Sequence, residues 1–309
     1  MQHDMDKKSF IITVDTEGDN RWNFQAGDEI TTRNAEYIPR FQALCDEFGF
    51  KPVYLTNFEM ANSPVFVSEA GRWLRDERCE IGVHLHAWNN PPQHDLSGPY
   101  DGQPYLIEYP EAVMRQKFQV IHSLLERQFG IKPVSHRAGR WAMNAAYFDL
   151  LREFGIRVDC SCTPFISWAA SKGVTCGGSD YSHAAEHPSV IGGVLEVPMT
   201  VRRTRVPLTG SWKYRLKTLV KGSSVWLRPA LESVAAMRWL MNRVHGEPVD
   251  YLEFMIHSSE LMPGGSPYNE TGHSVEIFFD KMRRVFEHAA ELGYEGRTLA
   301  EYCAMRCEK

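Results

Sequence analysis

The stretch FIITVDTEGDN (residues 10–20) joins a run of β-branched and aromatic residues to an acidic end. Such a run predicts a buried strand, and the polar residues predict that the strand stops there. Six further runs of this kind follow along the chain. They are PVYLT (52–56), EIGVHLH (80–86), PVSHRA (133–138), IRVDCS (156–161), GVLEVPM (193–199) and YLEFMIHS (251–258).

Helical patterns separate several of these runs. Residues 34–48, 110–129, 144–154 and 274–292 have helical periodicity, and each stretch ends just before a glycine. Glycine favours a helix end because it adopts the left-handed conformation without a Cβ clash. The alternation of strand and helix predicts parallel strands joined by right-handed crossovers.

Two architectures fit this alternation, an open doubly wound sheet and a closed barrel. No Gly-x-Gly-x-x-Gly motif follows the first strand, which removes the best support for the dinucleotide-binding open sheet. Polar residues at the C-terminal ends of different strands favour a barrel, where those ends meet at one mouth. These residues are Asp15, His84, His86, Arg137, Asp159 and His257. We therefore predict an α/β fold, a distorted (β/α)7 barrel of parallel strands that is TIM-barrel-like, as a single domain over residues 1–309.

Composition narrows the class of protein. The chain is 24% charged and 43% hydrophobic, which is typical of a globular protein. The 34 Lys and Arg residues against 39 Asp and Glu residues give a net charge of −5, which argues against a nucleic-acid partner. The polar start of the sequence and the absence of a long apolar stretch favour a cytoplasmic location.

Two segments interrupt the rhythm of strands and helices. Residues 87–110 are rich in Pro, Gly and Asn, and we expect them to form a loop over the barrel mouth. Residues 201–228 form a basic insertion without Asp or Glu. This insertion could hold the phosphate of a nucleotide- or lipid-linked sugar, with peripheral contact to the inner membrane, or could be a solvated helix face. Its cations are Arg202, Arg203, Arg205, Lys213, Arg215, Lys217, Lys221 and Arg228.

The spacing of histidines and acids indicates a metal site. His84 and His86 are two apart on a predicted strand, so both imidazoles would lie on one face. Asp15 and Glu17 share a face in the same way, and Asp19 follows. Each group alone could be a hydrogen-bonded loop or a solvated turn. Together, two histidines and a carboxylate are typical of a catalytic zinc site with an open position for water.

Other candidate residues surround this predicted site. An arginine at a strand end can hold a carboxylate in its ionised form, and Arg137 and Arg140 are the candidates. Trp88 and Trp141 offer flat apolar surfaces that could stack on a sugar ring or pack in the core. His257 ends the last long strand and could act as a general acid.

Taken in order, these motifs resemble those of the polysaccharide deacetylase superfamily, also called the NodB-homology or carbohydrate esterase family 4 domain. VDTEGD, GVHLH, HRAGRW, VDCSCTP (158–164) and MIHSSEL resemble the first to fifth motifs of that family. HRAGRW and IHSSEL are also similar to a WalW-like subgroup associated with lipopolysaccharide and cell-surface polysaccharide biosynthesis. The resemblance implies a distorted barrel that binds one divalent metal, usually zinc, and removes acetyl groups from N-acetyl sugars.

The resemblance also implies roles for single residues. It makes Asp15 the general base, oriented by Arg137, and His257 the general acid, modulated by Asp159. It makes the first acidic residue after the base and two histidines the metal ligands. Thr16 and Trp88 stand where the family has an acid and a second histidine, so Glu17, or else Asp19, and His86 would replace them.

The sequence thus predicts a zinc-dependent carbohydrate N-deacetylase. Its substrate would be a sugar or glycan precursor in cell-surface polysaccharide biosynthesis. Substrate contacts would come from Trp88, Arg140 and Trp141. Two alternatives stay open: a deformylase that acts on a lipid-phosphate-linked sugar, and a catalytically retired barrel that binds glycan.

Overall fold

The computed structural model describes residues 7–23, 28–205 and 222–307. A nine-stranded sheet runs in the order β10-β1-β2-β3-β4-β5-β7-β6, with β11 paired to β1. The seven strands from β10 to β7 are all parallel, and only β6 is antiparallel to its neighbour. The strands are β1 (Ser9–Thr16), β2 (Pro52–Thr56), β3 (Glu80–Leu85), β4 (Ser135–Ala138), β5 (Val158–Asp159), β6 (Ser189–Ile191), β7 (Val194–Glu196), β10 (Tyr251–His257) and β11 (Glu295–Gly296).

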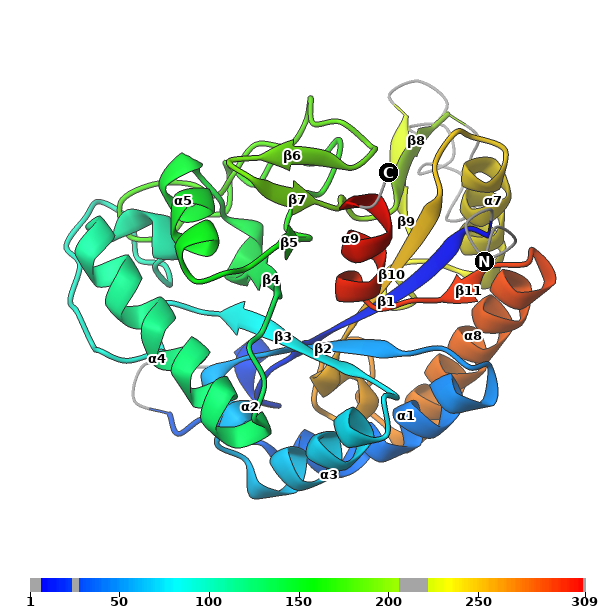
Figure 1. The fold of residues 1–309 in the computed structure, drawn as a ribbon, viewed down its shortest axis with the longest axis horizontal. Coiled ribbons are helices and arrows are strands. Elements are labelled where there is room, and N and C mark those ends of the chain that lie inside the picture. The colour runs from blue at the N-terminus through cyan, green and yellow to red at the C-terminus, as the bar shows by residue number, and fades with distance from the viewer. Residues whose placement is uncertain (1–6, 24–27, 206–221, 308–309) are drawn as a thin grey trace.

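The seven runs predicted as strands correspond to these seven parallel strands. Every residue of β1, β2 and β3 is buried, as expected for a parallel sheet covered on both faces. Helices α4, α3, α1 and α8 follow one another around the outside of the curled sheet (Figure 1). The α-helices are α1 (Ile38–Glu47), α2 (Phe58–Ala61), α3 (Pro64–Arg75), α4 (Glu111–Phe129), α5 (Ala145–Glu153), α7 (Val234–His245), α8 (Gly272–Glu291) and α9 (Leu299–Cys307).

The four predicted helices are present with small shifts at their ends. The glycines that follow them, Gly49, Gly130, Gly155 and Gly293, all have positive φ angles between 67° and 78°. The first predicted helix is divided into a 3-10 helix, η2 (Arg33–Tyr37), and α1. The α-helix begins at Ile38 because Pro39 fits its first turn and has no N–H to donate to an earlier carbonyl.

The sheet curls into a half-barrel, which confirms the predicted α/β fold and the distorted barrel. It does not close into a complete ring, because no strand pairing joins β7 to β10 among the strands that the structure describes. Single hydrogen bonds cross this seam instead, from Leu227 N to Thr200 O (3.0 Å) and from Met255 N to Leu227 O (3.3 Å). Pro198, which follows β7, has no N–H for a longer ladder.

The basic insertion begins and ends in a small antiparallel sheet. Strands β8 (Val201–Thr204) and β9 (Ser223–Trp226) pair with each other, so the described ends of this segment are not a helix face. Lys213, Arg215, Lys217 and Lys221 lie outside the described residues. Among the helices that the structure describes, none has the length and apolar character that crossing a bilayer requires.

A buried lysine fixes the start of the segment 87–110. Lys117, on α4, is fully buried, and its Nζ atom donates to the carbonyl oxygens of Ala87 (2.8 Å), Asn90 (2.8 Å) and Pro92 (2.6 Å). Three carbonyl acceptors compensate the ammonium group for the water that it loses. This contact holds the chain that leaves β3 against α4.

We expect Lys117→Met to destabilise the protein by about 2–4 kcal/mol, because it leaves three buried carbonyl groups without their donor. The free energy of unfolding from urea denaturation measures this effect. Lys132→Met, at an exposed position, is the matched control and should change stability by less than about 0.5 kcal/mol. Equal losses in the two variants would contradict the role of Lys117.

Candidate active site

Strand register brings the predicted site residues together. Asp15 lies opposite His257 across β1 and β10, and His84 lies opposite Arg137 across β3 and β4. All four are at or near the C-terminal ends of parallel strands, where such ends converge. Residues separated by up to 242 positions in the sequence therefore meet in one buried cluster.

Arg137 holds Asp15 from the interior of the barrel. Its Nη1 atom donates to Asp15 Oδ1 at 2.6 Å, and its Nη2 atom donates to Thr13 Oγ1 (2.8 Å) and to Glu253 Oε1. Burial alone would raise the pKa of the Asp15 carboxyl, but Arg137, His84 and His257 together outweigh burial, and the pKa lies below its ordinary value. Asp15 is therefore an ionised carboxylate whose second oxygen is left for the centre of the site.

Glu17, His84 and His86 form the candidate metal centre. His86 Nε2 lies 2.9 Å from Glu17 Oε2 and 3.1 Å from His84 Nε2. The ligand atoms of the three residues all lie within 4.8 Å of one another. This geometry confirms the prediction, made from the spacing of these residues, that the acidic turn and both histidines meet.

The chemistry of these three side chains fits a divalent cation. His84 Nδ1 lies 2.9 Å from the carbonyl oxygen of Arg137, which accepts its proton and leaves the Nε2 lone pair facing the cluster. Burial and the neighbouring Arg21 lower the pKa of His86 to about 3, so its imidazole is neutral. Glu17 Oε2 is buried, and His86 Nε2 at 2.9 Å is not aligned with it for a hydrogen bond. A cation shared by these atoms would satisfy all of them.

Asp19, the alternative carboxylate ligand, lies in a different contact. Arg33 donates to its carboxylate from the backbone N (2.8 Å), Nε (3.1 Å) and Nη2 (2.8 Å), and Thr31 Oγ1 donates at 3.0 Å. These bonds tie the loop after β1 to residues 31–33. Asp19 therefore lies outside the candidate metal centre, whose carboxylate is Glu17.

His257 faces the same centre from β10. Its Nε2 atom lies 3.8 Å from Asp15 Oδ2 and 3.9 Å from Glu17 Oε1. Its Nδ1 atom faces Arg228 Nη2 at 3.0 Å and Glu260 Oε1 at 3.5 Å. Glu260 belongs to η5 (Ser258–Leu261), the 3-10 turn that directly follows the strand.

The expected pairing of Asp159 with His257 is not what the structure contains. Asp159 Oδ1 lies 2.6 Å from His136 Nδ1 and accepts from Ser161 Oγ at 2.9 Å. The register of β4 and β5 places Asp159 directly opposite His136. The Asp159 carboxylate is therefore hydrogen-bonded to His136 rather than to His257 on β10. Arg228 and Glu260 occupy the position beside His257 instead.

Arg140 and Trp141 have packing contacts. Arg140 donates to Ser171 Oγ (3.0 Å), to Lys172 O (2.9 Å) and to Gln103 O, and so joins two loops. Trp141 is 7% exposed and stacks on Trp168, with ring centroids 6.5 Å apart. The expected contact with a sugar is therefore not available to the Trp141 ring in this arrangement, because its faces are covered.

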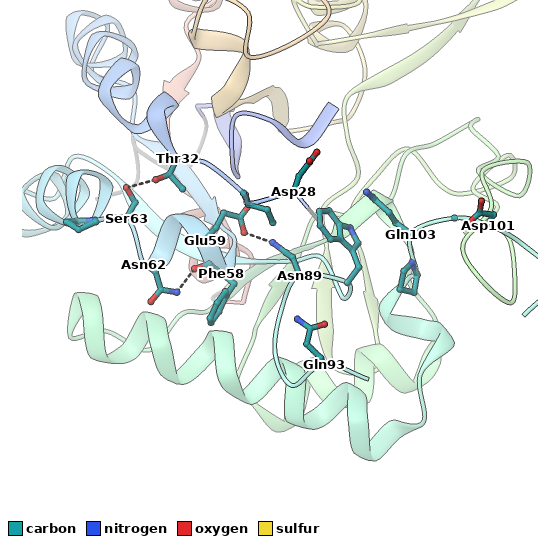
Figure 2. A pocket seen from close by; sticks show the side chains of 15 residues that line it. Asp28, Thr32, Phe58, Glu59, Asn62, Ser63, Asn89, Gln93, Asp101 and Gln103 are labelled. Carbon is teal, nitrogen blue, oxygen red and sulfur yellow. Dashed lines mark hydrogen bonds between the residues drawn. The ribbon is translucent and has the colours of Figure 1, made fainter. Parts of the chain in front are cut away.

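Trp88 lines a large cavity next to His86, and Figure 2 shows polar residues such as Glu59, Asn89 and Gln103 that line the same cavity. The cavity measures about 1270 Å³ and lies between α2, residues 28–32 and the segment 87–110. The Trp88 ring centroid is 6.3 Å from that of His86, so this cavity begins next to a metal ligand. Its polar lining consists of Asp28, Thr32, Glu59, Asn62, Ser63, Asn89, Gln93, Asp101 and Gln103.

Sequence reasoning missed Arg21 and Glu59, which connect the cavity to the metal centre. Arg21 lies 3.7 Å from Glu17 Oε2 and 3.3 Å from Glu59 Oε1, and its guanidinium carbon lies 4.1 Å from the Trp88 ring centroid. The spacing of four between Glu17 and Arg21 was the available signal. Sequence reasoning also missed Glu260, although it lies within the quoted motif MIHSSEL, and did not assign Arg228 a place at the site.

The sequence matches no protein-family model and no curated protein. Solved structures are similar in fold. A putative polysaccharide deacetylase from Mycobacterium smegmatis matches 95% of this chain over 94% of its own length, with 16% identity and a TM-score of 0.50. A 4-alpha-glucanotransferase from Thermococcus litoralis matches 96% of this chain with 14% identity and a TM-score of 0.55, over 40% of its own length. The chain thus shares its fold, at low sequence identity, with a putative polysaccharide deacetylase.

Proposed function

We propose that this protein is a zinc-dependent hydrolase that removes the N-acetyl group from an amino sugar of a glycan or glycan precursor. The observation that carries the proposal is the buried centre of Glu17, His84 and His86, with Asp15 and His257 at its edge. Two histidines and one carboxylate leave a coordination position open, as catalytic zinc sites do. The fold similarity and the order of the motifs support the same reaction.

A divalent cation bound by these ligands would act as a Lewis acid that polarises the amide carbonyl and acidifies a water molecule. The protein's own residues supply the proton transfers. Asp15 accepts the proton of the attacking water with Oδ2, because Oδ1 is occupied by Arg137. His257 directs Nε2 toward the same space, from which it would donate a proton to the amide nitrogen as the C–N bond breaks.

The cavity beside Trp88 supports a saccharide as the substrate. Side-chain amides, hydroxyls and an aromatic ring are groups that bind the hydroxyls and the apolar face of a sugar. Among the described residues that line the cavity there are three carboxylates and neither lysine nor arginine, although Arg21 pairs with one of these carboxylates, Glu59, at 3.3 Å. This charge favours a neutral or amine-bearing glycan at the cavity over a phosphorylated one.

The structure of the basic insertion supports an anionic precursor less strongly than its sequence does. Arg202 is buried and forms ion pairs with Glu186 (3.2 Å) and Glu247 (2.7 Å), and Arg228 is buried beside His257 and Glu260. Both arginines therefore form ion pairs within the protein. A nucleotide- or lipid-linked substrate, a place in lipopolysaccharide biosynthesis and the cytoplasmic location stay predictions of the sequence.

We expect His86→Ala and Glu17→Gln to weaken zinc binding by at least about 100-fold, because each variant removes one of three ligands. Isothermal titration calorimetry on metal-free protein, together with metal analysis, measures this loss. His273→Ala, at an exposed position, should bind zinc as the native protein does. Unchanged zinc affinity in His86→Ala would refute the metal centre.

We expect Asp15→Asn to lower the rate of acyl release by about 10²–10⁴-fold, because an amide cannot accept the proton of water. Zinc binding should persist, since Asp15 is not among the three ligands. Acetate and formate are measured separately with N-acetylglucosamine oligomers and N-formyl sugars as substrates. Formate release alone would favour the deformylase, and saccharide binding without any acyl release by the native protein would favour the retired glycan-binding barrel.

We expect Trp88→Ala to raise KM for an N-acetylglucosamine oligomer by about 2- to 12-fold, since one aromatic contact contributes about 0.5–1.5 kcal/mol. Trp88→Phe, which keeps an aromatic ring, is the matched control. Steady-state kinetics with a neutral oligomer and its phosphorylated counterpart test the charge of the cavity. A preference for the phosphorylated oligomer would contradict our assignment of the cavity.

A further inference from the structure

The motif HSSE (257–260) connects the candidate active site to an exposed aromatic ring. The Ser258 hydroxyl accepts from the backbone N–H of Glu17 at 3.1 Å and lies 3.0 Å from the carbonyl oxygen of the same residue. The next residue, Ser259, is fully buried and accepts from Trp22 Nε1 at 3.1 Å. The turn that follows β10 therefore fixes both the loop of the candidate carboxylate ligand and the Trp22 ring.

Trp22 is exposed although its indole is anchored. It belongs to η1 (Arg21–Asn23), and 36% of its surface is exposed. The one polar atom of its side chain, Nε1, is bound to Ser259. The rings of His257 and Tyr268 lie 5.2 Å and 5.6 Å away at angles of 66° and 87°, so neither is stacked parallel on the indole. An apolar surface beside the reaction centre is thus held in one orientation and is open to solvent.

Tyr268 and Trp22 together form an aromatic corner. Tyr268 is 40% exposed, and its ring centroid lies 5.9 Å from the guanidinium carbon of Arg228. The neighbouring Asn269 is buried and donates from Nδ2 to the carbonyl oxygen of Glu260 at 2.7 Å. The loop that contains Tyr268 is therefore tied to the same turn that holds Trp22.

The geometry of the proposed reaction places a sugar ring near the aromatic corner. A proton donor lies within about 2.6–3.2 Å of the atom that it protonates, and a single C–N bond is about 1.45 Å long. If His257 protonates the amide nitrogen, the sugar carbon bonded to that nitrogen lies within about 5 Å of Nε2. Because the indole centroid of Trp22 is 5.2 Å from the imidazole centroid, the same sugar ring can contact the indole.

We propose that Trp22 and Tyr268 form the subsite that binds the sugar ring whose N-acyl group is removed. This inference rests on the proposed function and deepens it, because it names the site of the reacting unit. The carbon-bound hydrogens of a pyranose form an apolar face that packs on an aromatic ring. Ser259 fixes the indole before the sugar arrives, which reduces the entropy that binding costs.

Adjacent side chains of η1 reach two sides of the candidate metal centre. The guanidinium carbon of Arg21 lies 4.1 Å from the Trp88 ring centroid, whereas Trp22 contacts His257. The reacting ring at the aromatic corner and a second sugar unit in the cavity beside Trp88 can therefore bind at the same time. The aromatic corner thus favours a substrate of at least two sugar units.

The first experiment follows the indole N–H signals in 15N-labelled protein, in the zinc-loaded Asp15→Asn variant. Trp22→Phe and Trp88→Phe in this variant assign the two signals by their disappearance. We expect an N-acetylglucosamine trimer to shift both signals, and the monosaccharide N-acetylglucosamine to shift the Trp22 signal more than the Trp88 signal. A trimer that shifts the Trp88 signal alone, or neither signal, would overturn the inference.

Affinities in the same variant measure the contribution of the ring. Trp22→Ala should raise Kd for the trimer by about 2- to 12-fold, the range for one aromatic contact, and Trp22→Phe should restore most of the affinity. Isothermal titration calorimetry measures both. Val190→Ala, which removes exposed apolar surface from β6 at the other end of the strand order, should leave Kd unchanged. An unchanged Kd in Trp22→Ala would contradict the subsite.

Ser259 is a positioning residue, since it acts on the substrate through Trp22. Ser259→Ala removes the acceptor of the indole N–H, so we expect the Trp22 signal to change before any ligand is added and Kd to rise by about 2- to 12-fold. Ser259→Thr keeps the hydroxyl and should restore both. In Trp22→Ala, the added Ser259→Ala should change Kd no further. A further loss there would refute the positioning role.

These measurements separate the inference from the proposed function. Binding to the Asp15→Asn variant requires no hydrolysis, so it reports on the aromatic corner even in a protein that cleaves nothing. Trimer binding at Trp22 without acyl release by the native protein would refute only the hydrolase. Acyl release from the trimer together with an unchanged Kd in Trp22→Ala would refute only the aromatic subsite.

Discussion

The buried guanidinium of Arg137 is the interaction on which the candidate active site depends. It has no exposed surface, and a charge in that environment must be paired and hydrogen-bonded. Asp15 and Glu253 provide the pairing from β1 and β10, and Thr13 and the Cys160 carbonyl accept further bonds. Removing one partner of such a buried pair typically costs about 3–5 kcal/mol, so the ends of these strands are fixed relative to one another.

Arg137 also orients the candidate metal centre through its backbone. Its carbonyl oxygen lies 2.9 Å from His84 Nδ1, so the residue that keeps Asp15 ionised also directs the lone pair of His84. Trp141 covers the guanidinium, whose central carbon lies 4.9 Å from the ring centroid. Burial raises the pKa of Glu253 to about 7 in spite of Arg137, which leaves Asp15 as the fully ionised partner of the arginine.

The periodicity of the sequence and the polar residues at the strand ends were sufficient to predict part of the fold and part of the candidate site. Seven parallel strands and the meeting of Glu17, His84 and His86 follow from alternating elements and a spacing of two, and no tertiary information is needed for either. The partner of Asp159 could not be predicted, because it depends on the register of β4 against β5, and register is a property of the folded sheet. Arg140 and Trp141 were misjudged for a related reason: loops far away in the sequence cover them.

Arg228 is another residue whose contacts could not be predicted from the sequence. A tract of eight cations without an acid resembles a surface that binds anions, yet two of its arginines end in buried ion pairs. The fold thus places Arg137 against Asp15 and Arg228 against His257. The first helps to keep a carboxylate charged and able to accept a proton, and the second lies 3.0 Å from Nδ1 of the imidazole. Because arginine does not titrate near neutral pH, both arginines stay charged there, and the candidate metal centre lies beside both Asp15 and His257.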